Sequence, residues 1–204
     1  MEKENIKEDK ESNSLIGTCF LGWAGSGKTY MGSRLADYLG VDFIGESTVD
    51  SVFHKNITDP VTKYVMLKSK ESYEIARLEG HIALKESFVS DMHMAGIYST
   101  FTELLEDRKN VYDGIYRRFD ESNQDGLVHT IGLDISEQQL VKNLQKRGDY
   151  DILKKFLPTM YLQMQGLMNY LTQHNLVNFN VVSADDFYPF DVNDFVEKSG
   201  LCLS

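Results

Sequence analysis

Residues that could bind a phosphate group occur together near the N-terminus, in the segment Gly22-Trp23-Ala24-Gly25-Ser26-Gly27-Lys28-Thr29. The segment fits the pattern G-x-x-x-x-G-K-[ST], in which glycines let backbone N–H groups close around phosphate oxygens. In this pattern Lys28 reaches the β- and γ-phosphates of ATP, and the Thr29 hydroxyl ligates Mg²⁺. The predicted nucleotide contacts are Gly22, Ala24, Gly25, Ser26, Gly27, Lys28, Thr29 and Tyr30.

The segments on either side of this loop have the character of a strand and a helix. Residues 15–21 are mostly apolar and have the length of a buried strand. In residues 30–39, apolar side chains recur at helical spacing, and Gly40 can end that helix. The partial positive charge of a helix N-terminus would stabilise a phosphate bound at the loop. A glycine-rich turn that binds nothing is the alternative, and the complete motif between a strand and a helix argues against it.

The composition of the 204-residue chain is typical of one folded domain. Hydrophobic residues make up 42% of it, which is enough for one sizeable core. Residues 1–14 are mostly charged and polar, so we expect a disordered tail followed by a single domain over residues 15–204. The formal net charge of −10 argues against a broad nucleic-acid-binding surface, although a local basic cleft stays compatible with it.

Cysteine usage and hydropathy bear on location. The two cysteines, Cys19 and Cys202, provide neither a disulfide framework nor a metal-binding spacing. No apolar run approaches the roughly 18 residues of a membrane span, and the N-terminus has no signal-peptide pattern. We therefore expect a cytoplasmic protein without membrane contact. The sequence does not indicate its oligomeric state.

Glu46 is a candidate contact for a second substrate. Residues 40–46 have the pattern of a short second strand, which would place Glu46 at the edge of the sheet where open α/β proteins bind ligands. The carboxylate could contact the substrate or act as a general base, and a capping or surface glutamate is an equally good interpretation. Residues 47–108 read as mostly helical, and we expect this insertion to hold the phosphate acceptor.

Asp113, Arg117 and Arg118 form a second group of candidates. Residues 109–114 have the pattern of a third strand that ends in Asp113. An acid at a strand tip beside a phosphate loop can hold Mg²⁺ through water, and the arginines can neutralise phosphoryl charge. A tight Asp-Gly turn followed by two solvated arginines is the alternative. Residues 107–109 offer a rival position for the acid–arginine pair.

The second half of the chain alternates strands and helices. Residues 128–135 are predicted as a strand, and Ser136 can cap a helix that ends at Arg147. Arg147 could act on a phosphoryl group or only complement the helix dipole. A further helix, strand and helix are predicted over residues 152–174, 178–182 and 191–198. The alternation predicts an α/β fold with a parallel sheet of about five strands and helices on both faces.

Three stretches resemble small P-loop kinases. Residues 20–44 resemble the opening of this group, shikimate and gluconate kinases included. Residues 111–117 resemble the Asp-Gly-x-Pro-Arg segment of adenylate kinases and other nucleoside monophosphate kinases, with Tyr116 in the place of the proline. Residues 131–170 are similar to the fourth strand, lid and following helix of those enzymes and of deoxynucleoside kinases.

The resemblance implies a three-layer P-loop NTPase kinase fold with strand order 2-3-1-4-5. It implies an ATP-dependent phosphotransferase that moves the γ-phosphoryl group of Mg-ATP to a small acceptor, a nucleoside monophosphate or a nucleoside. In such an enzyme Lys28 and Thr29 bind phosphate and metal, Arg117 grips an acceptor phosphate, and Arg147 belongs to a short lid over residues 145–153. The lid departs from the pattern, since Asn143 and Asp149 stand where these kinases often carry arginine.

Two other functions remain open. A polynucleotide 5′-kinase would share this sheet but would need a basic channel that the net charge does not favour. A nucleotide-binding regulator could keep the phosphate loop and lack turnover, which the departures in the lid would suit. We therefore expect a small-molecule acceptor, and not a nucleic acid, as the partner.

Overall fold

The computed structural model of the chain describes residues 16–45, 69, 73, 76–91, 127–155, 157–174 and 178–201. Within these residues, parallel strands form a five-stranded sheet in the order β2-β3-β1-β4-β5. The strands are β1 (Gly17–Leu21), β2 (Asp42–Ile44), β3 (Phe88–Ser90), β4 (Val128–Asp134) and β5 (Phe179–Ser183). The predicted α/β class, parallel sheet and strand order are confirmed. The expected tail, residues 1–14, lies outside the described residues.

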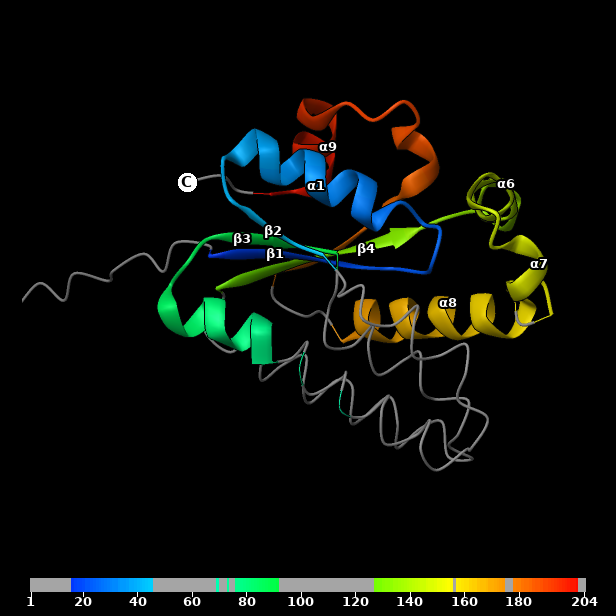
Figure 1. The fold of residues 1–204 in the computed structure, drawn as a ribbon, viewed down its shortest axis with the longest axis horizontal. Coiled ribbons are helices and arrows are strands. Elements are labelled where there is room, and N and C mark those ends of the chain that lie inside the picture. The colour runs from blue at the N-terminus through cyan, green and yellow to red at the C-terminus, as the bar shows by residue number, and fades with distance from the viewer. Residues whose placement is uncertain are drawn as a thin grey trace, which may run out of the picture.

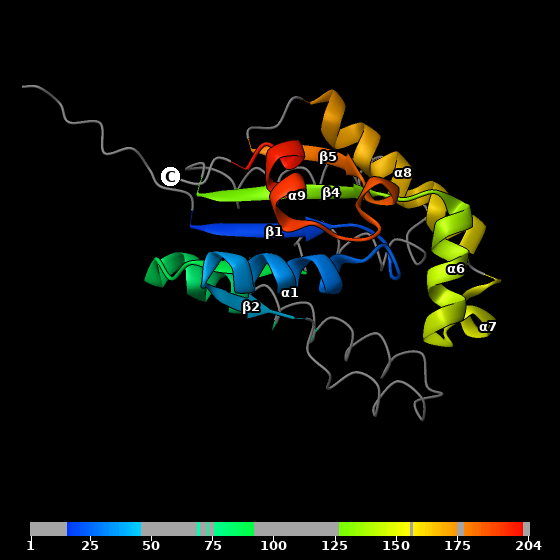
Figure 2. The same cartoon turned by 90° about the horizontal axis from the view of Figure 1, so that it is seen from above.

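Helices cover both faces of the sheet (Figure 1). One face carries α1 (Lys28–Leu39) and α9 (Val192–Ser199), and the other carries α8 (Leu157–Gln173) and a helix over residues 76–84. Beyond the carboxyl ends of the strands lie α6 (Glu137–Arg147) and α7 (Tyr150–Leu153), as Figure 2 shows from above. A 3-10 turn, η2 (Ala184–Phe187), links β5 to the segment before α9. Among the described helices, none has the length and apolar character that crossing a membrane requires.

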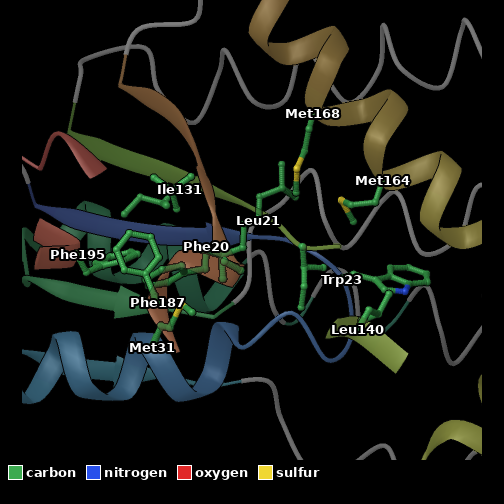
Figure 3. Packing of buried hydrophobic residues seen from close by; sticks show 14 of the residues in the cluster. Phe20, Leu21, Trp23, Met31, Ile131, Leu140, Met164, Met168, Phe187 and Phe195 are labelled. Carbon is green, nitrogen blue, oxygen red and sulfur yellow. The ribbon is translucent and has the colours of Figure 1, made fainter. Parts of the chain in front are cut away.

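β1 lies in the middle of the sheet and is buried along its whole length. Phe20 faces the layer of α1 and α9, where its ring stacks on that of Phe195 with centroids 5.8 Å apart. Leu21 faces the opposite layer, towards Met168 of α8 (Figure 3). Because side chains alternate across a strand and both faces are covered, β1 is apolar at successive positions. This packing fixes the end of β1, and with it the start of the phosphate loop.

The helices that flank the site begin and end where the sequence predicts. Gly40 ends α1 with φ of 66°, a left-handed conformation that glycine adopts without a Cβ clash. The Ser136 hydroxyl accepts a hydrogen bond from the Gln139 N–H at 3.2 Å and so caps α6. The Asp191 carboxylate caps α9 in the same way, through the Asn193 N–H at 2.8 Å.

The third strand lies elsewhere than the sequence predicts. We expected it over residues 109–114, which lie outside the described residues. The strand between β2 and β1 is instead Phe88–Ser90, within the segment of residues 47–108 that we expected to be mostly helical. The carboxyl residue at the tip of this strand is therefore Asp91, and Asp113 lies outside the described residues.

Two local features hide β3 from sequence patterns. The strand has only three residues, so it shows no alternation, and Phe88 and Val89 continue the helical spacing of the segment before it. The preceding helix ends at Lys85, which adopts φ of 55° where a glycine would have signalled the end. Because the helix ends without a glycine and the strand has only three residues, the sequence pattern over both resembles one uninterrupted helix.

Candidate functional site

The loop between β1 and α1 contains the predicted phosphate-binding residues. Gly25 and Gly27 both have φ of 94°, a backbone conformation that residues with a Cβ rarely adopt. The Ser26 N–H donates a hydrogen bond to the Trp23 carbonyl at 3.0 Å and closes a turn inside the loop. The Ser26 hydroxyl is buried and has no hydrogen-bond partner among the described residues, so this polar group can serve a ligand oxygen. The loop thus fits the phosphate group that its sequence predicts.

Lys28, the first residue of α1, lies folded over this loop. Its Nζ donates to the Gly22 carbonyl at 2.6 Å and to the Trp23 carbonyl at 2.8 Å. The ammonium group has three rotatable donors on a flexible stem, so it can exchange backbone carbonyls for phosphate oxygens. Its position at the helix N-terminus adds a full positive charge to the partial charge of the helix dipole.

Asp91 brings a carboxylate to the phosphate loop. It follows β3 directly and is 4% exposed. The Thr29 hydroxyl donates to Asp91 Oδ2 at 2.5 Å. A hydroxyl and a carboxylate are hard oxygen donors of the class that Mg²⁺ prefers, and Mg²⁺ commonly uses one or two carboxylates together with substrate phosphates. The two residues therefore fit the metal that accompanies a nucleoside triphosphate.

Sequence reasoning missed Asp91 because it missed β3. The signal was the apolar pair Phe88 and Val89 followed two residues later by a carboxylate, the same pattern that made Glu46 a candidate after β2. Glu46, Asp113, Arg117 and Arg118 all lie outside the described residues, so their roles stay predictions.

The α6 helix also contacts the phosphate loop, through a residue that the sequence did not mark as functional. Asn143 Nδ2 donates to the Gly25 carbonyl at 2.8 Å and to the Tyr188 hydroxyl at 3.2 Å. Tyr188 lies between η2 and α9 and reaches the loop at Gly27. Burial raises the pKa of the Tyr188 phenol, and the hydrogen bond from Asn143 partly offsets that rise. Only the tertiary fold brings Tyr188 to the loop.

Arg147, the predicted lid arginine, is the last residue of α6. Its Nη2 lies 2.8 Å from Asp149 Oδ2, and the two side chains are 57% and 36% exposed. Gly148 between them adopts φ of 80° and ends the helix. The segment of residues 145–153 thus contains the end of α6, this glycine and α7. Whether it closes over a phosphoryl group stays a prediction.

The same fold occurs in solved structures of P-loop small-molecule kinases. A deoxyadenosine kinase from M. mycoides with bound dATP aligns with a TM-score of 0.62 and 18% identity over 90% of this chain and 96% of that one. The YorR protein of Bacillus subtilis in complex with phosphorylated GDP aligns with a TM-score of 0.56 and 12% identity, over 91% and 96% of the chains. Shikimate kinase from Bacteroides thetaiotaomicron aligns with a TM-score of 0.53 and 17% identity, over 92% and 100%.

At the level of sequence, no protein-family model matches the chain and no curated protein matches it. The structural likeness establishes the fold, a three-layer α/β P-loop kinase fold with strand order 2-3-1-4-5, as the sequence predicted. What the chain does with that fold has to come from the residues of the site.

Proposed function

We propose that this chain is an ATP-dependent phosphotransferase that moves the γ-phosphoryl group of Mg-ATP to a small acceptor, with a nucleoside as the preferred class. One observation carries the proposal. The complete phosphate loop, its Lys28 and the Thr29–Asp91 pair lie together at the carboxyl edge of a sheet with the kinase strand order. Each of these groups has a distinct use in phosphoryl transfer, and a glycine-rich turn without a ligand would need none of them.

The residues of the site divide the work of transfer between them. When bound, Mg-ATP would supply the phosphoryl group and a metal ion that neutralises phosphate charge. The backbone N–H groups of the loop orient the phosphates, and Lys28 follows the charge that develops as the γ-phosphoryl leaves. Thr29 and Asp91 would hold the metal through their oxygens. Phosphoryl transfer needs mainly positioning and electrostatic stabilisation, and these residues supply both.

The position of β3 supports a nucleoside over a nucleoside monophosphate. The case for a phosphorylated acceptor depended on the resemblance of residues 111–117 to the Asp-Gly-x-Pro-Arg segment of nucleoside monophosphate kinases, and on the expectation that the third strand ends there. Asp91 has that tip position instead. A nucleoside has no phosphate for an arginine to grip, and its hydroxyl needs a base. Glu46 follows β2 by two residues and is our first candidate for that base, with Asp113 the second.

The acceptor class is tested by ADP release from Mg-ATP in the presence of nucleosides, nucleoside monophosphates, shikimate, gluconate and a 5′-hydroxyl oligonucleotide. We expect turnover with a nucleoside and none with Lys28→Ala. If a nucleoside monophosphate is the better substrate, Arg117→Ala should raise the KM for that acceptor and leave ATP binding unchanged, and Arg118→Ala measures whether the second arginine also contacts the acceptor. Turnover with the oligonucleotide alone would replace the proposal with a polynucleotide kinase.

A second candidate function is a nucleotide-binding regulator without turnover. The ion pair between Arg147 and Asp149 favours it. Arg147, the arginine of the predicted lid, is paired with a carboxylate, and this carboxylate stands where many such kinases carry a second arginine. ATP binding without ADP release for every acceptor would support this function. The cytoplasmic location expected from the sequence stays a prediction.

A further inference from the structure

The peptide unit between Gly25 and Ser26 is held at both of its ends. Its N–H, from Ser26, donates to the Trp23 carbonyl at 3.0 Å, and its carbonyl, from Gly25, accepts from Asn143 Nδ2 at 2.8 Å. Glycine has a low barrier to changing its backbone conformation, so a peptide next to Gly25 can rotate unless both ends are fixed. Rotation would break both hydrogen bonds and turn the Gly25 carbonyl towards the Trp23 carbonyl, which would change the shape of the phosphate loop. Asn143 supplies the second of the two restraints.

The Asn143 amide also restrains Gly27, the second glycine of the loop with positive φ. The Tyr188 hydroxyl, which accepts from Asn143 Nδ2 at 3.2 Å, lies 2.7 Å from the place where a Cβ on Gly27 would be. A hydroxyl in that place covers the backbone at the N-terminus of α1. Asn143 thus contacts Gly25 directly and Gly27 through Tyr188, and these glycines share φ of 94°.

The orientation of the Asn143 amide is itself determined. Gln139 Nε2, one turn earlier on α6, donates to Asn143 Oδ1 at 2.9 Å. The carbonyl side of the amide is therefore used, and the two N–H bonds of Nδ2 are directed at Gly25 and Tyr188. Two hydrogen bonds from one fixed amide give geometric precision that a single flexible contact would not give.

Apolar packing of α6 on the loop is separate from these hydrogen bonds. A Cβ on Gly25 would lie 3.0 Å from Leu144 and 3.1 Å from Leu140, so both leucines already contact the loop. Figure 3 shows Leu140 beside Trp23, within the main hydrophobic core. Because this packing persists without the amide, a substitution at Asn143 tests the hydrogen bonds and leaves the helix in place.

We propose that Asn143 is a positioning residue for the donor nucleotide, which sets the conformation of the phosphate loop through Gly25 and Tyr188. The inference deepens the proposed function and rests on ATP being the ligand of this loop. It assigns a role to a side chain that acts through the backbone of the loop and through Tyr188. Its effect is on the affinity for the phosphates of ATP, and the affinity for the acceptor is independent of it.

The first test uses the ligand-free protein, so it does not depend on the proposed function. Asn143→Leu keeps the size of the side chain and removes both hydrogen bonds. We expect faster hydrogen exchange at the Ser26 amide in Asn143→Leu. The matched control, Gln145→Leu, makes the same kind of change at an exposed position two residues along α6 and should leave that exchange rate unchanged. Equal exchange in the wild type and Asn143→Leu, with equal Tm, would overturn the proposal.

The second test measures Mg-ATP binding by the fluorescence of Trp23, the single tryptophan of the chain, which lies in the loop. We expect Asn143→Leu to weaken binding about tenfold, as the loss of two hydrogen bonds implies, and Tyr188→Phe to weaken it less. The double variant should resemble Asn143→Leu, because Tyr188 acts through the same amide. The KM for ATP should rise while the KM for the acceptor stays constant.

The outcomes separate this inference from the proposed function. If wild-type protein binds neither Mg-ATP nor inorganic tripolyphosphate, the proposed function fails, and the exchange experiment alone decides whether Asn143 restrains the loop. If the wild type binds Mg-ATP and Asn143→Leu binds it within twofold at equal Tm, the positioning role fails and the proposed function stands. If Asn143→Leu and Tyr188→Phe have additive effects on the affinity for Mg-ATP, Tyr188 does not act through the Asn143 amide.

Discussion

The Thr29 hydroxyl donates a hydrogen bond to the buried Asp91 carboxylate across 2.5 Å, which joins the first turn of α1 to the end of β3. The two residues are 62 positions apart in sequence. Because parallel strands place their carboxyl ends at one edge of the sheet, neighbouring β1 and β3 bring the phosphate loop and this carboxylate together. The pair supplies the two kinds of oxygen that a magnesium ion on ATP would use.

Asp91→Asn should therefore affect the metal-dependent step. The substitution keeps size and one acceptor oxygen and removes the negative charge. We expect kcat to fall by ~10²-fold and the Mg²⁺ concentration for half-maximal rate to rise, as the loss of one electrostatic partner in phosphoryl transfer implies. A magnesium titration of the rate measures both. Thr29→Ser, which keeps the hydroxyl, is the matched control, and an unaltered magnesium dependence in Asp91→Asn would remove Asp91 from the metal site.

Lys28→Ala should remove a charge that follows the phosphates into the transition state. We expect kcat to fall by ~10²-fold or more, with a smaller effect on Tm from the loss of the two hydrogen bonds to the Gly22 and Trp23 carbonyls. Steady-state kinetics and thermal unfolding measure the two effects. Lys142→Ala changes an exposed lysine on α6 and should leave both unchanged. Normal turnover in Lys28→Ala would exclude Lys28 from the mechanism.

The residues of the site that could be predicted from sequence are those close together in the chain. The phosphate loop carries its own signature, because the glycine conformations, the lysine and the helix N-terminus lie within a few residues. Gly40 and Ser136 likewise mark helix ends by local chemistry. Local signals of this kind were enough to give the strand order once the loop was assigned to the kinase fold.

The residues that could not be predicted depend on contacts between distant segments. Asp91 was missed because β3 is short and continues a helical spacing, and the helix before it ends at Lys85 without glycine. Tyr188 meets the loop only through the path of the chain after β5. Asn143 was noted as a departure from an arginine position, and its hydrogen bond to Gly25 is visible only in three dimensions.

Asp149→Asn should raise turnover if Arg147 acts on the transferring group. The two side chains form an ion pair at 2.8 Å on an exposed surface. Such pairs contribute about 0–1 kcal/mol, so releasing Arg147 should raise kcat by up to about fivefold. Arg147→Ala should lower kcat more than it weakens ATP binding, because its charge matters most during transfer.

The same lid should change its protection when ligands bind. Hydrogen exchange across residues 145–153 should slow with ATP plus acceptor, since a closed lid excludes water from the transfer. Lys154→Ala, which removes an exposed pairing with Asp151, is the control for charge changes nearby. Equal protection with and without ligands, together with normal kcat in Arg147→Ala, would leave Arg147 as a residue that only complements the helix dipole.

His129 makes the stability of the fold depend on pH. The side chain lies on β4, is 6% exposed, and its Nε2 has no hydrogen-bond partner among the described residues. Burial lowers the pKa of His129 below its ordinary value of 6.5, and a hydrogen bond with the Ser199 backbone only partly opposes this. The unfolded chain therefore binds a proton at a higher pH than the folded chain does. Stability should be complete above pH 6.5 and decrease as the pH falls below it.

Thermal unfolding from pH 7.5 to 5.5 tests this, because most carboxylates stay ionised in that range. We expect Tm to fall as the pH passes below 6.5, by about 2–4 °C for each kcal/mol lost in a chain of this size. His129→Gln cannot take up the proton, so its Tm should change less over the same range even if the variant is less stable at pH 7.5. His174→Gln replaces an exposed histidine and should keep the wild-type slope. A wild-type slope in His129→Gln would show that another group binds the proton.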